Sequence, residues 1–300
     1  MRRGVARAAL LLLAAACAPR TPPATGGARF VVGEPYRMGG VWSYPREDHG
    51  LAESGLAVVL PDAPRGRRTA NGETHDPAAL AAAHRTLQMP AVVSVWNLDT
   101  GRELRVRVND RGPVEPGRVI GLSRRAGELL GVGQAEPARV RIAVDPAGSR
   151  AAAEGLPGSE GPRLAIEAAP VAAVEREQLA PPPGARAAVA GRGEIAARGA
   201  AVPAASVSPS PDRAPAGLPE RVEQRGAVPS RLLVDAGTFF RRDLAERRAA
   251  ALGGRVEALA SGRQPEYRVR LGPFASVPEA DRALARAFGS GVPDARIVLD

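Results

Sequence analysis

Lysine is absent from this 300-residue chain, so all 41 basic residues are arginine, and aromatic residues make up only 3% of the sequence. The formal net charge is +9, but the surplus is spread along the chain, and no stretch combines a basic stripe with interleaved aromatics. Because nucleic-acid-binding proteins usually carry such a stripe, the sequence argues against a nucleic-acid partner. An arginine-only, alanine-rich composition is better explained by GC-rich coding than by a selected binding surface.

Cysteine occurs once, at Cys17, and the apolar run before it is too short for a permanent membrane-spanning helix. A basic head followed by the apolar run 8–16 is typical of an export signal. A lone cysteine in an exported chain cannot form an internal disulfide. The small residues before Cys17 resemble a bacterial lipobox, with Leu13 one position earlier than usual.

We therefore expect residues 1–16 to be a lipoprotein signal peptide and Cys17 to carry the lipid anchor. The alternative is a plain secretory signal with an incidental cysteine. Ala18 follows Cys17 in place of the aspartate that commonly retains lipoproteins in the inner membrane. This favours a periplasm-facing protein anchored in the outer membrane of a Gram-negative cell.

Composition divides the remaining chain into four parts. Residues 17–27 form a tether, and residues 28–145 hold most of the β-like patterning. Residues 146–227 are rich in Ala, Pro, Gly and Ser and contain few large apolar side chains, so we expect a disordered linker. Patterned sequence resumes over residues 228–300.

Residues 28–145 predict short strands, tight turns and one or two short helices, which together favour a closed β-barrel. The expected strands span 91–97, 104–108, 118–123 and 139–144. Ser123 can cap a helix over 124–130 that ends at Gly131. A short apolar helix is expected to end at His84.

The C-terminal part predicts a ferredoxin-like β-α-β-β-α-β unit. Its strands are expected near 232–236, 255–259, 267–271 and 295–299, and its helices over 243–252 and 278–288. The overall fold class is thus mainly β plus α+β.

The segment from Gly66 to Arg111 is the strongest candidate for a functional site. It places one acid (Glu73), one imidazole (His84) and a second acid (Asp110) on loops around the predicted β scaffold. Cleaving a glycosidic bond requires a proton for the leaving oxygen and negative charge near an oxocarbenium-like centre. The residue types therefore fit a site that cuts a sugar bond.

These motifs resemble a known family. The segments 67–73 (Arg-Arg-Thr-Ala-Asn-Gly-Glu), 80–87 and 108–113 (Val-Asn-Asp-Arg-Gly-Pro), with the lead-in 36–48, resemble the double-psi β-barrel of the rare lipoprotein A family. The segments 236–239 and 267–274 are similar to a SPOR domain, a module that binds peptidoglycan. The resemblance covers both predicted folded parts and the lipoprotein signal.

The resemblance implies a septal endolytic lytic transglycosylase that acts on peptidoglycan strands stripped of their stem peptides and leaves 1,6-anhydro ends. Glu73, His84 and Asp110 match the family's functional residues. We assign Asp110 as the acid/base and Glu73 as the electrostatic or second acid/base group, and we expect His84 either to hold a carboxylate by a hydrogen bond or to set its protonation. The expected substrate-binding residues are Asn71, Asn109 and Arg111 on the barrel and Phe239, Tyr267 and Arg268 on the SPOR-like domain. Division-site proteins are further candidate partners.

Two segments depart from the family pattern. The family usually has Ala-Ser-Trp-Tyr-Gly before the Gly-rich turn, whereas Ala57 is followed here by Val58–Pro61 without aromatics. The family also usually has an aspartate before Leu-Ser, where this chain has Gly121. The first change removes a stacking platform for a sugar ring, and the second removes an acid.

Two other functions remain open. The barrel could be a non-catalytic glycan binder similar to expansins, or the SPOR-like domain could make the protein a septal localisation factor. No cofactor is expected, because no Gly-rich loop has phosphate-binding spacing. No metal is expected either, because His49, His75 and His84 lack paired ligand spacing.

Overall fold

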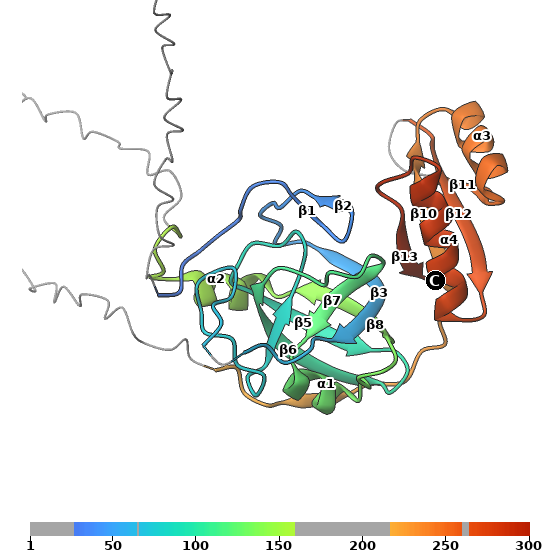
Figure 1. Cartoon of the computed structure of the whole chain (residues 1–300). Coiled ribbons are helices and arrows are strands. Elements are labelled where there is room, and N and C mark those ends of the chain that lie inside the picture. The colour runs from blue at the N-terminus through green and yellow to red at the C-terminus, as the bar shows by residue number, and fades with distance from the viewer. Residues whose placement is uncertain (1–26, 65, 160–216, 260–263) are drawn as a thin grey trace, which may run out of the picture.

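The computed structural model describes residues 27–64, 66–159, 217–259 and 264–300, which form two folded units (Figure 1). The predicted signal peptide, Cys17, nearly all of the tether and residues 160–216 of the predicted linker lie outside the described residues.

A closed six-stranded barrel forms the first unit. Its strands follow one another around the ring as β4 (Ala81–Ala83), β7 (Arg118–Leu122), β3 (Ala52–Val59), β8 (Ala138–Val144), β5 (Ala91–Asn97) and β6 (Arg102–Asp110), and β6 pairs back with β4. The β3–β7 and β4–β6 pairings are parallel, and the others are antiparallel. The predicted double-psi β-barrel is confirmed.

The barrel interior is filled by alternating side chains of its strands. Along β6, Leu104, Val106 and Val108 are buried and face the inside, while the arginines between them face outward. Strand β5 adds Val93 and Val95 to the same core. The small barrel is therefore packed with aliphatic side chains, and its functional groups lie at its ends and outer surface.

Helix α1 (Arg124–Leu130) begins and ends where its sequence predicts. The Ser123 hydroxyl accepts the backbone N–H of Ala126, and Gly131 takes a left-handed conformation with φ of 71° at the C-terminus. No acidic residue supports its first turn, so the local signals for this helix are its two caps.

The predicted apolar helix ending at His84 is wrong, because residues 81–83 form β4. Ala82 lies opposite Val108 of β6 on one side and opposite Leu122 of β7 on the other. Alanine favours helices in isolation, but pairing on both edges closes the barrel and outweighs that preference. The strand delivers His84 to one end of the barrel.

The predicted linker, residues 146–227, contains a helix and a strand in the two end parts that the structure describes, contrary to the expected disorder. Helix α2 (Pro146–Ala153) begins at Asp145, whose carboxylate accepts the N–H of Gly148 at 3.0 Å. Ser149 on this helix accepts the N–H of Val92 at 2.9 Å, which ties α2 to the edge of β5. Strand β9 (Val222–Gln224) pairs with the start of β6. Local caps and edge pairing thus order sequence that is poor in large apolar residues.

A two-stranded hairpin, β1 (Tyr36–Met38) and β2 (Val41–Ser43), forms its own small sheet beside the barrel (Figure 1). The Arg85 guanidinium donates to the carbonyl of Met38 at 3.2 Å and to that of Val114 at 2.9 Å. Tyr36 donates its hydroxyl to the Arg85 carbonyl at 2.8 Å. These bonds hold the hairpin over the barrel end where His84 lies.

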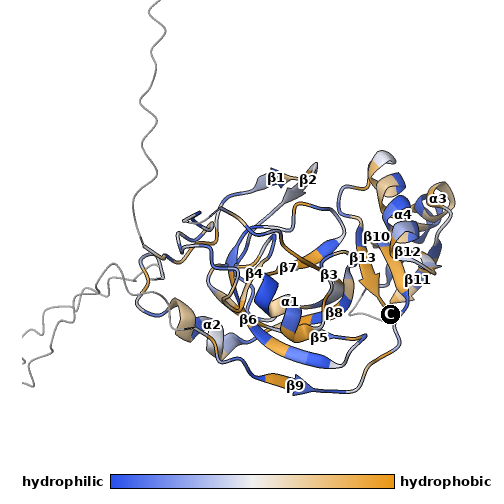
Figure 2. Cartoon of the chain, turned by 60° about the horizontal axis from the view of Figure 1, so that its bottom comes forward, coloured by the Kyte–Doolittle hydropathy of each residue, from blue (hydrophilic) through white to orange (hydrophobic). Residues whose placement is uncertain are grey.

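The second unit is a four-stranded sheet with two helices, in the predicted β-α-β-β-α-β order. Its elements are β10 (Leu232–Phe239), α3 (Arg242–Leu252), β11 (Arg255–Leu259), β12 (Glu266–Phe274), α4 (Val277–Gly289) and β13 (Arg296–Leu299). The sheet order is β11-β12-β10-β13. Figure 2 shows β10 and β13 as hydrophobic strands, and their buried residues form a second core with α3 and α4.

The two units meet where β13 lies beside β3. The Ser54 hydroxyl donates to the carbonyl of Leu299 at 3.0 Å and accepts its N–H at 3.2 Å. Arg118 of the barrel forms a two-pronged ion pair with Asp281 of α4, at 2.7 and 2.9 Å. Gly117 permits this approach, because a Cβ there would lie 2.9 Å from the Cδ1 atom of Ile297. The second unit therefore covers one side of the barrel.

Candidate active site

A polar turn over residues 67–73 holds Glu73 inside a hydrogen-bond network. Arg107 donates through Nε and Nη2 to Glu73 Oε1, at 3.0 and 2.8 Å. Asn109 donates to Oε2 at 2.7 Å, and Asn71 donates to Oε1 at 2.8 Å. With four donors and only 6% of the residue exposed, the Glu73 carboxylate is fixed in place.

Glu73 is an ionised carboxylate in this structure. Burial by itself raises the pKa of the Glu73 carboxyl, but the hydrogen bonds and positive charge of Arg107, with the amides of Asn109 and Asn71, outweigh burial and lower that pKa. Its chemistry is therefore that of a fixed negative charge, and a general acid must come from another residue.

Asp110 is held at the end of β6 by the same turn. Its Oδ1 accepts the backbone N–H groups of Ala70 at 3.0 Å and Arg111 at 2.9 Å, and its Oδ2 accepts Arg67 Nη2 at 2.5 Å. The side chain of Asp110 is 14% exposed, and that of Arg67 is 39% exposed. Two fixed backbone donors orient one oxygen, while the other depends on a partner that reaches solvent.

The same turn holds both predicted acids. Asn71 on this turn donates its N–H to the carbonyl of Asn109, next to Asp110, while Asn71 itself binds Glu73. Residues 40 positions apart, Ala70 and Asp110, are thus in direct contact. Two carboxylates with different surroundings share one scaffold, which is the arrangement that separates an acid/base from a fixed charge.

His84 is buried, with one ring nitrogen facing the backbone and the other facing a carboxylate. Its Nδ1 lies 3.2 Å from the N–H nitrogen of Thr86 and 3.1 Å from that of Leu87. Two N–H donors require an acceptor, so Nδ1 carries no proton and the neutral ring carries its proton on Nε2. Nε2 then donates to Glu53 Oε1 at 3.1 Å. In this structure the carboxylate that His84 orients is that of Glu53.

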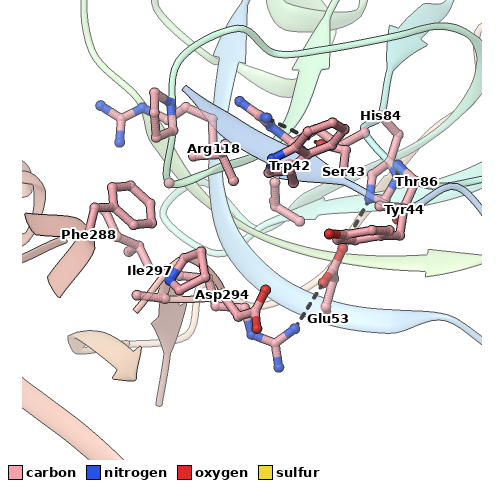
Figure 3. Close-up of a pocket in the computed structure, with 18 of the residues that line it drawn as sticks. Trp42, Ser43, Tyr44, Glu53, His84, Thr86, Arg118, Phe288, Asp294 and Ile297 are labelled. Atoms are coloured by element: carbon pink, nitrogen blue, oxygen red, sulfur yellow. Dashed lines mark hydrogen bonds and ion pairs between the residues drawn. The ribbon is translucent and has the colours of Figure 1, made fainter. Parts of the chain in front are cut away.

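A pocket of about 370 Å³ opens beside His84, between the hairpin, the barrel and the second unit (Figure 3). Trp42, Tyr44, Glu53 and His84 line it from the barrel side, and residues 293–297 line it from the second unit. Glu73 and Asp110 do not line this pocket. Glu73 and Asp110 are held by the 67–73 turn, whereas the His84 imidazole lies at the pocket wall. The backbone N–H of His84 donates to the carbonyl of Asp110 at 3.1 Å, so these two residues are neighbours.

The predicted sugar-binding residues of the barrel are bound to protein groups. Asn71 is fully buried, and Asn109 is buried with its amide on Glu73. The guanidinium of Arg111 donates to the carbonyls of Leu87 (2.5 Å), His84 (3.3 Å) and Val32. Burial lowers the pKa of Arg111, although Asp110 and Tyr36 act in the opposite direction. In the described state these three residues organise the site.

The predicted SPOR-site residues lie on two faces of the second sheet. Phe239 lies opposite Tyr267, and both rings pack partly against the core under the helices. Arg268 is the next residue along β12 and therefore points to the other face, where its Nε lies 3.8 Å from a carboxylate oxygen of Asp235. The structure joins the two aromatics and places the arginine apart from them.

Sequence reasoning missed three charged partners. Arg107 is detectable in principle, because it shares a face of β6 with Asn109 and lies near the same turn. Arg67 sits in the recognised motif, but its pairing with Asp110 depends on the fold of the turn. Glu53 gives no signal, because a lone glutamate near the start of a strand is usually a solvated residue.

The two departures from the family pattern are physically linked. A Cβ at Gly121 would lie 2.5 Å from Leu60 Cδ2 and 2.8 Å from Leu60 Cγ. A Cβ at Gly127 would likewise lie 2.5 Å from Val59 Cγ2. Aliphatic side chains that replace the family's aromatics thus fill the space above glycines, and Leu60 occupies the place of the missing acid.

This coupling predicts the outcome of a double-mutant cycle. We expect Gly121→Ala to destabilise the chain by about 1–3 kcal/mol, because the new methyl group collides with Leu60. Leu60→Ala should relieve that collision, so the double variant should lose less stability than the sum of the single variants. Thermal unfolding followed by circular dichroism measures the cycle, and strictly additive losses would show that Leu60 is not the obstacle.

In the part of the chain that the structure describes, no group of three His, Cys, Asp or Glu residues could hold a metal ion. No helix among the described residues is long and apolar enough to cross a membrane.

Comparison with known proteins identifies both folded units. A family model described as a lytic transglycolase matches residues 61–142, and a SPOR domain model matches residues 229–292. The endolytic peptidoglycan transglycosylase RlpA of Pseudomonas aeruginosa is 34% identical over 267 residues, which cover 84% of this chain and 72% of that protein.

Shorter matches fall on proteins of the same name. RlpA of Yersinia pestis is 44% identical over 102 residues, covering 34% of this chain and 28% of that protein. RlpA of Vibrio cholerae is 42% identical over 120 residues, covering 37% of this chain and 46% of that protein. A crystal structure of the RlpA SPOR domain from Pseudomonas aeruginosa matches with 26% identity over 22% of this chain and 96% of that chain, at a TM-score of 0.22. Because a TM-score of 0.22 is too low to support an argument, the family assignment rests on the sequence matches.

Proposed function

The chain belongs to the RlpA family of endolytic peptidoglycan transglycosylases, and we propose that it cleaves the bond between MurNAc and GlcNAc in stem-peptide-free glycan strands, leaving 1,6-anhydro ends. The observation that supports this most directly is the pair of carboxylates, Glu73 and Asp110, held by one turn of the barrel. Their different surroundings suit the two tasks of glycoside cleavage.

Asp110 is the acid/base in this proposal. Its Oδ1 stays bound to two backbone N–H groups, so the catalytic proton sits on Oδ2, and Arg67 must move toward solvent when the substrate enters. Oδ2 protonates the glycosidic oxygen, which leaves as the 4-hydroxyl of GlcNAc. The C6 hydroxyl of the MurNAc then attacks C1 and returns its proton to Asp110, so no water is consumed.

Glu73 and His84 support this chemistry in different ways. Glu73 supplies a fixed negative charge that favours the positively charged transition state, since its lowered pKa keeps it ionised at neutral pH. His84 donates through Nε2 to Glu53 and holds that carboxylate at the pocket wall. No cofactor enters this scheme.

Purified protein incubated with stem-peptide-free strands tests the proposal. Mass spectrometry should show shortened strands with 1,6-anhydro MurNAc ends, released from within the strands and not stepwise from one end. The alternative is a non-catalytic, expansin-like binder, which the burial of Glu73 and the filling of the Gly121 site by Leu60 favour. Strand binding without shortened products, at high protein concentration, would select the binder.

We place the protein at the division septum, in the outer membrane through Cys17, where strand cleavage would contribute to wall remodelling and daughter-cell separation. The SPOR match over residues 229–292 supports binding to septal peptidoglycan.

Localisation has its own expected outcome. A fluorescent fusion of residues 231–300, exported to the periplasm, should gather at the division site, because all but one of the buried core residues of the second unit lie in this segment. Fluorescence microscopy of dividing cells measures this, and the Cys17→Ser full chain separates septal enrichment from anchoring. Uniform envelope labelling by the fusion would contradict septal binding by this domain.

A further inference from the structure

Two exposed aromatic rings stand at the mouth of the pocket between the two units. Trp42 and Tyr44 are two residues apart, their ring centroids lie 6.5 Å apart with an angle of 24° between the ring planes, and they are 53% and 61% exposed. Both line the pocket (Figure 3). Exposed aromatic groups beside a concave surface that carries a few polar groups are typical of a ligand-binding site.

The pocket wall next to Tyr44 is polar and pre-oriented. In Figure 3 the Glu53 carboxylate lies beside the Tyr44 ring, with the imidazole of His84 behind it. The described residues give the Glu53 carboxylate one hydrogen bond, from His84, and its side chain is 26% exposed. Glu53 therefore has lone pairs free to accept hydroxyl groups of a ligand.

The opposite wall carries a loosely paired positive charge. Arg296 comes from the start of β13, and its side chain is 61% exposed. Its nearest carboxylate oxygens, on Glu53 and Asp235, are both 3.9 Å away, which is longer than a hydrogen bond. Arg296 can thus bind a further anion without breaking a tight ion pair.

We propose that this pocket is a saccharide subsite in which Trp42 and Tyr44 stack against a sugar ring, Glu53 accepts a hydroxyl and Arg296 binds the lactyl carboxylate of a stripped MurNAc. The identity of this ligand rests on the proposed function. A pyranose offers an apolar C–H face to an aromatic ring and hydroxyls at its rim, and a volume of about 370 Å³ lies within the range of small-ligand pockets. The hairpin thereby supplies the aromatic platform that Val58–Pro61 lacks.

His84 has a positioning role in this subsite. Its two backbone contacts at Nδ1 fix the proton on Nε2, and Nε2 fixes Glu53. A glutamate with a set orientation loses less entropy when it binds a hydroxyl.

Fluorescence of Trp42 in the full chain tests the subsite. The chain has two tryptophans, and Trp96→Phe leaves Trp42 as the only emitter while keeping a ring beside Arg141 and Arg225. Titration with soluble GlcNAc oligosaccharides, and separately with stem-peptide-free strands, should change its emission saturably. Because Trp42 lies on the barrel hairpin, binding elsewhere on the SPOR domain does not mimic this signal.

Three further substitutions, each made in the Trp96→Phe chain, test the contacts assigned to the ligand. Tyr44→Ala should weaken binding of both probes about ten-fold, the effect of losing one stacked ring and its burial. Arg296→Gln should weaken binding of stripped strands only, since GlcNAc oligosaccharides lack the lactyl carboxylate. Val114→Ala removes an exposed apolar side chain outside the pocket lining and should change neither.

The outcomes separate this proposal from the proposed function. A saturable change in Trp42 emission without strand cleavage would support the proposed subsite and contradict the proposed enzymatic activity. Strand cleavage without any change in Trp42 emission would contradict the proposed subsite and support the enzymatic activity, provided that the Trp42→Ala/Tyr44→Ala variant also keeps its KM. If both hold, that double variant should raise KM about ten-fold with little change in kcat.

Discussion

Asp110→Asn is expected to reduce strand cleavage by about a hundred- to ten-thousand-fold, the contribution typical of a general acid–base group. The amide cannot release a proton to the leaving oxygen. Its oxygen can still accept the N–H groups of Ala70 and Arg111, so the turn should keep its shape. The rate of product formation on stem-peptide-free strands, measured at saturating substrate, gives the effect.

A matched control removes the same charge elsewhere. Asp62 is paired with Arg124 at 2.7 Å, and both side chains are almost half exposed. Asp62→Asn should therefore leave the rate within about two-fold, because exposed ion pairs contribute little. If Asp110→Asn cleaved strands at the rate of this control, Asp110 would not be the acid/base and the assignment would move to another carboxyl group.

Glu73→Ala is expected to cost about 3–5 kcal/mol of unfolding free energy, since it leaves the largely buried Arg107 without its partner. The amides of Asn71 and Asn109 would also lose their acceptor. Thermal or urea unfolding of the barrel measures the loss. Glu128→Ala, which removes an exposed helix pair with Arg125, is the control and should cost under about 0.5 kcal/mol.

The same carboxylate predicts how stability depends on pH. The folded pKa of Glu73 lies below its ordinary value of 4.5, because Arg107, Asn109 and Asn71 outweigh burial. Its stabilising contribution is then fully present above about pH 4.5 and is lost as the pH falls through the lowered folded pKa. The gap in melting temperature between the wild type and Glu73→Gln should therefore narrow on acidification. If the melting temperatures of the two proteins changed in parallel with pH, ionisation of Glu73 would not stabilise the fold.

The sequence predicts the elements whose signals are local. Helix α1 follows from its two caps, Ser123 and Gly131, and β5 and β6 follow from alternation and a glycine turn. The β-α-β-β-α-β order of the second unit follows in the same way. Each of these signals lies within a few residues of the structure that it specifies.

The failures have a different physical origin. Strand β4 is made of alanines whose strand geometry comes from β6 and β7, which are distant in sequence. Helix α2 depends on the cap at Asp145 and on Ser149 binding the edge of β5, in a stretch whose composition indicates disorder. Such elements are set by tertiary contacts, and local propensity is a weak guide to them.

The same distinction between local signals and long-range contacts applies to the candidate site. The motifs locate Glu73, His84 and Asp110, but the motif spacing says nothing of which groups surround each one. The pairing of His84 with Glu53 and that of Asp110 with Arg67 depend on three-dimensional proximity across 31 and 43 positions. The filling of the Gly121 site by Leu60 is likewise visible only once β7 and the end of β3 are side by side.

Digestion of stem-peptide-free strands in heavy-oxygen water tests the central claim most directly. An intramolecular attack by the C6 hydroxyl predicts new MurNAc ends that lack the mass of one water molecule and contain no heavy oxygen, and these products should vanish with Asp110→Asn. New reducing ends labelled with heavy oxygen would mean hydrolysis, and intact strands would mean that the barrel does not cut glycan; either result would contradict the account.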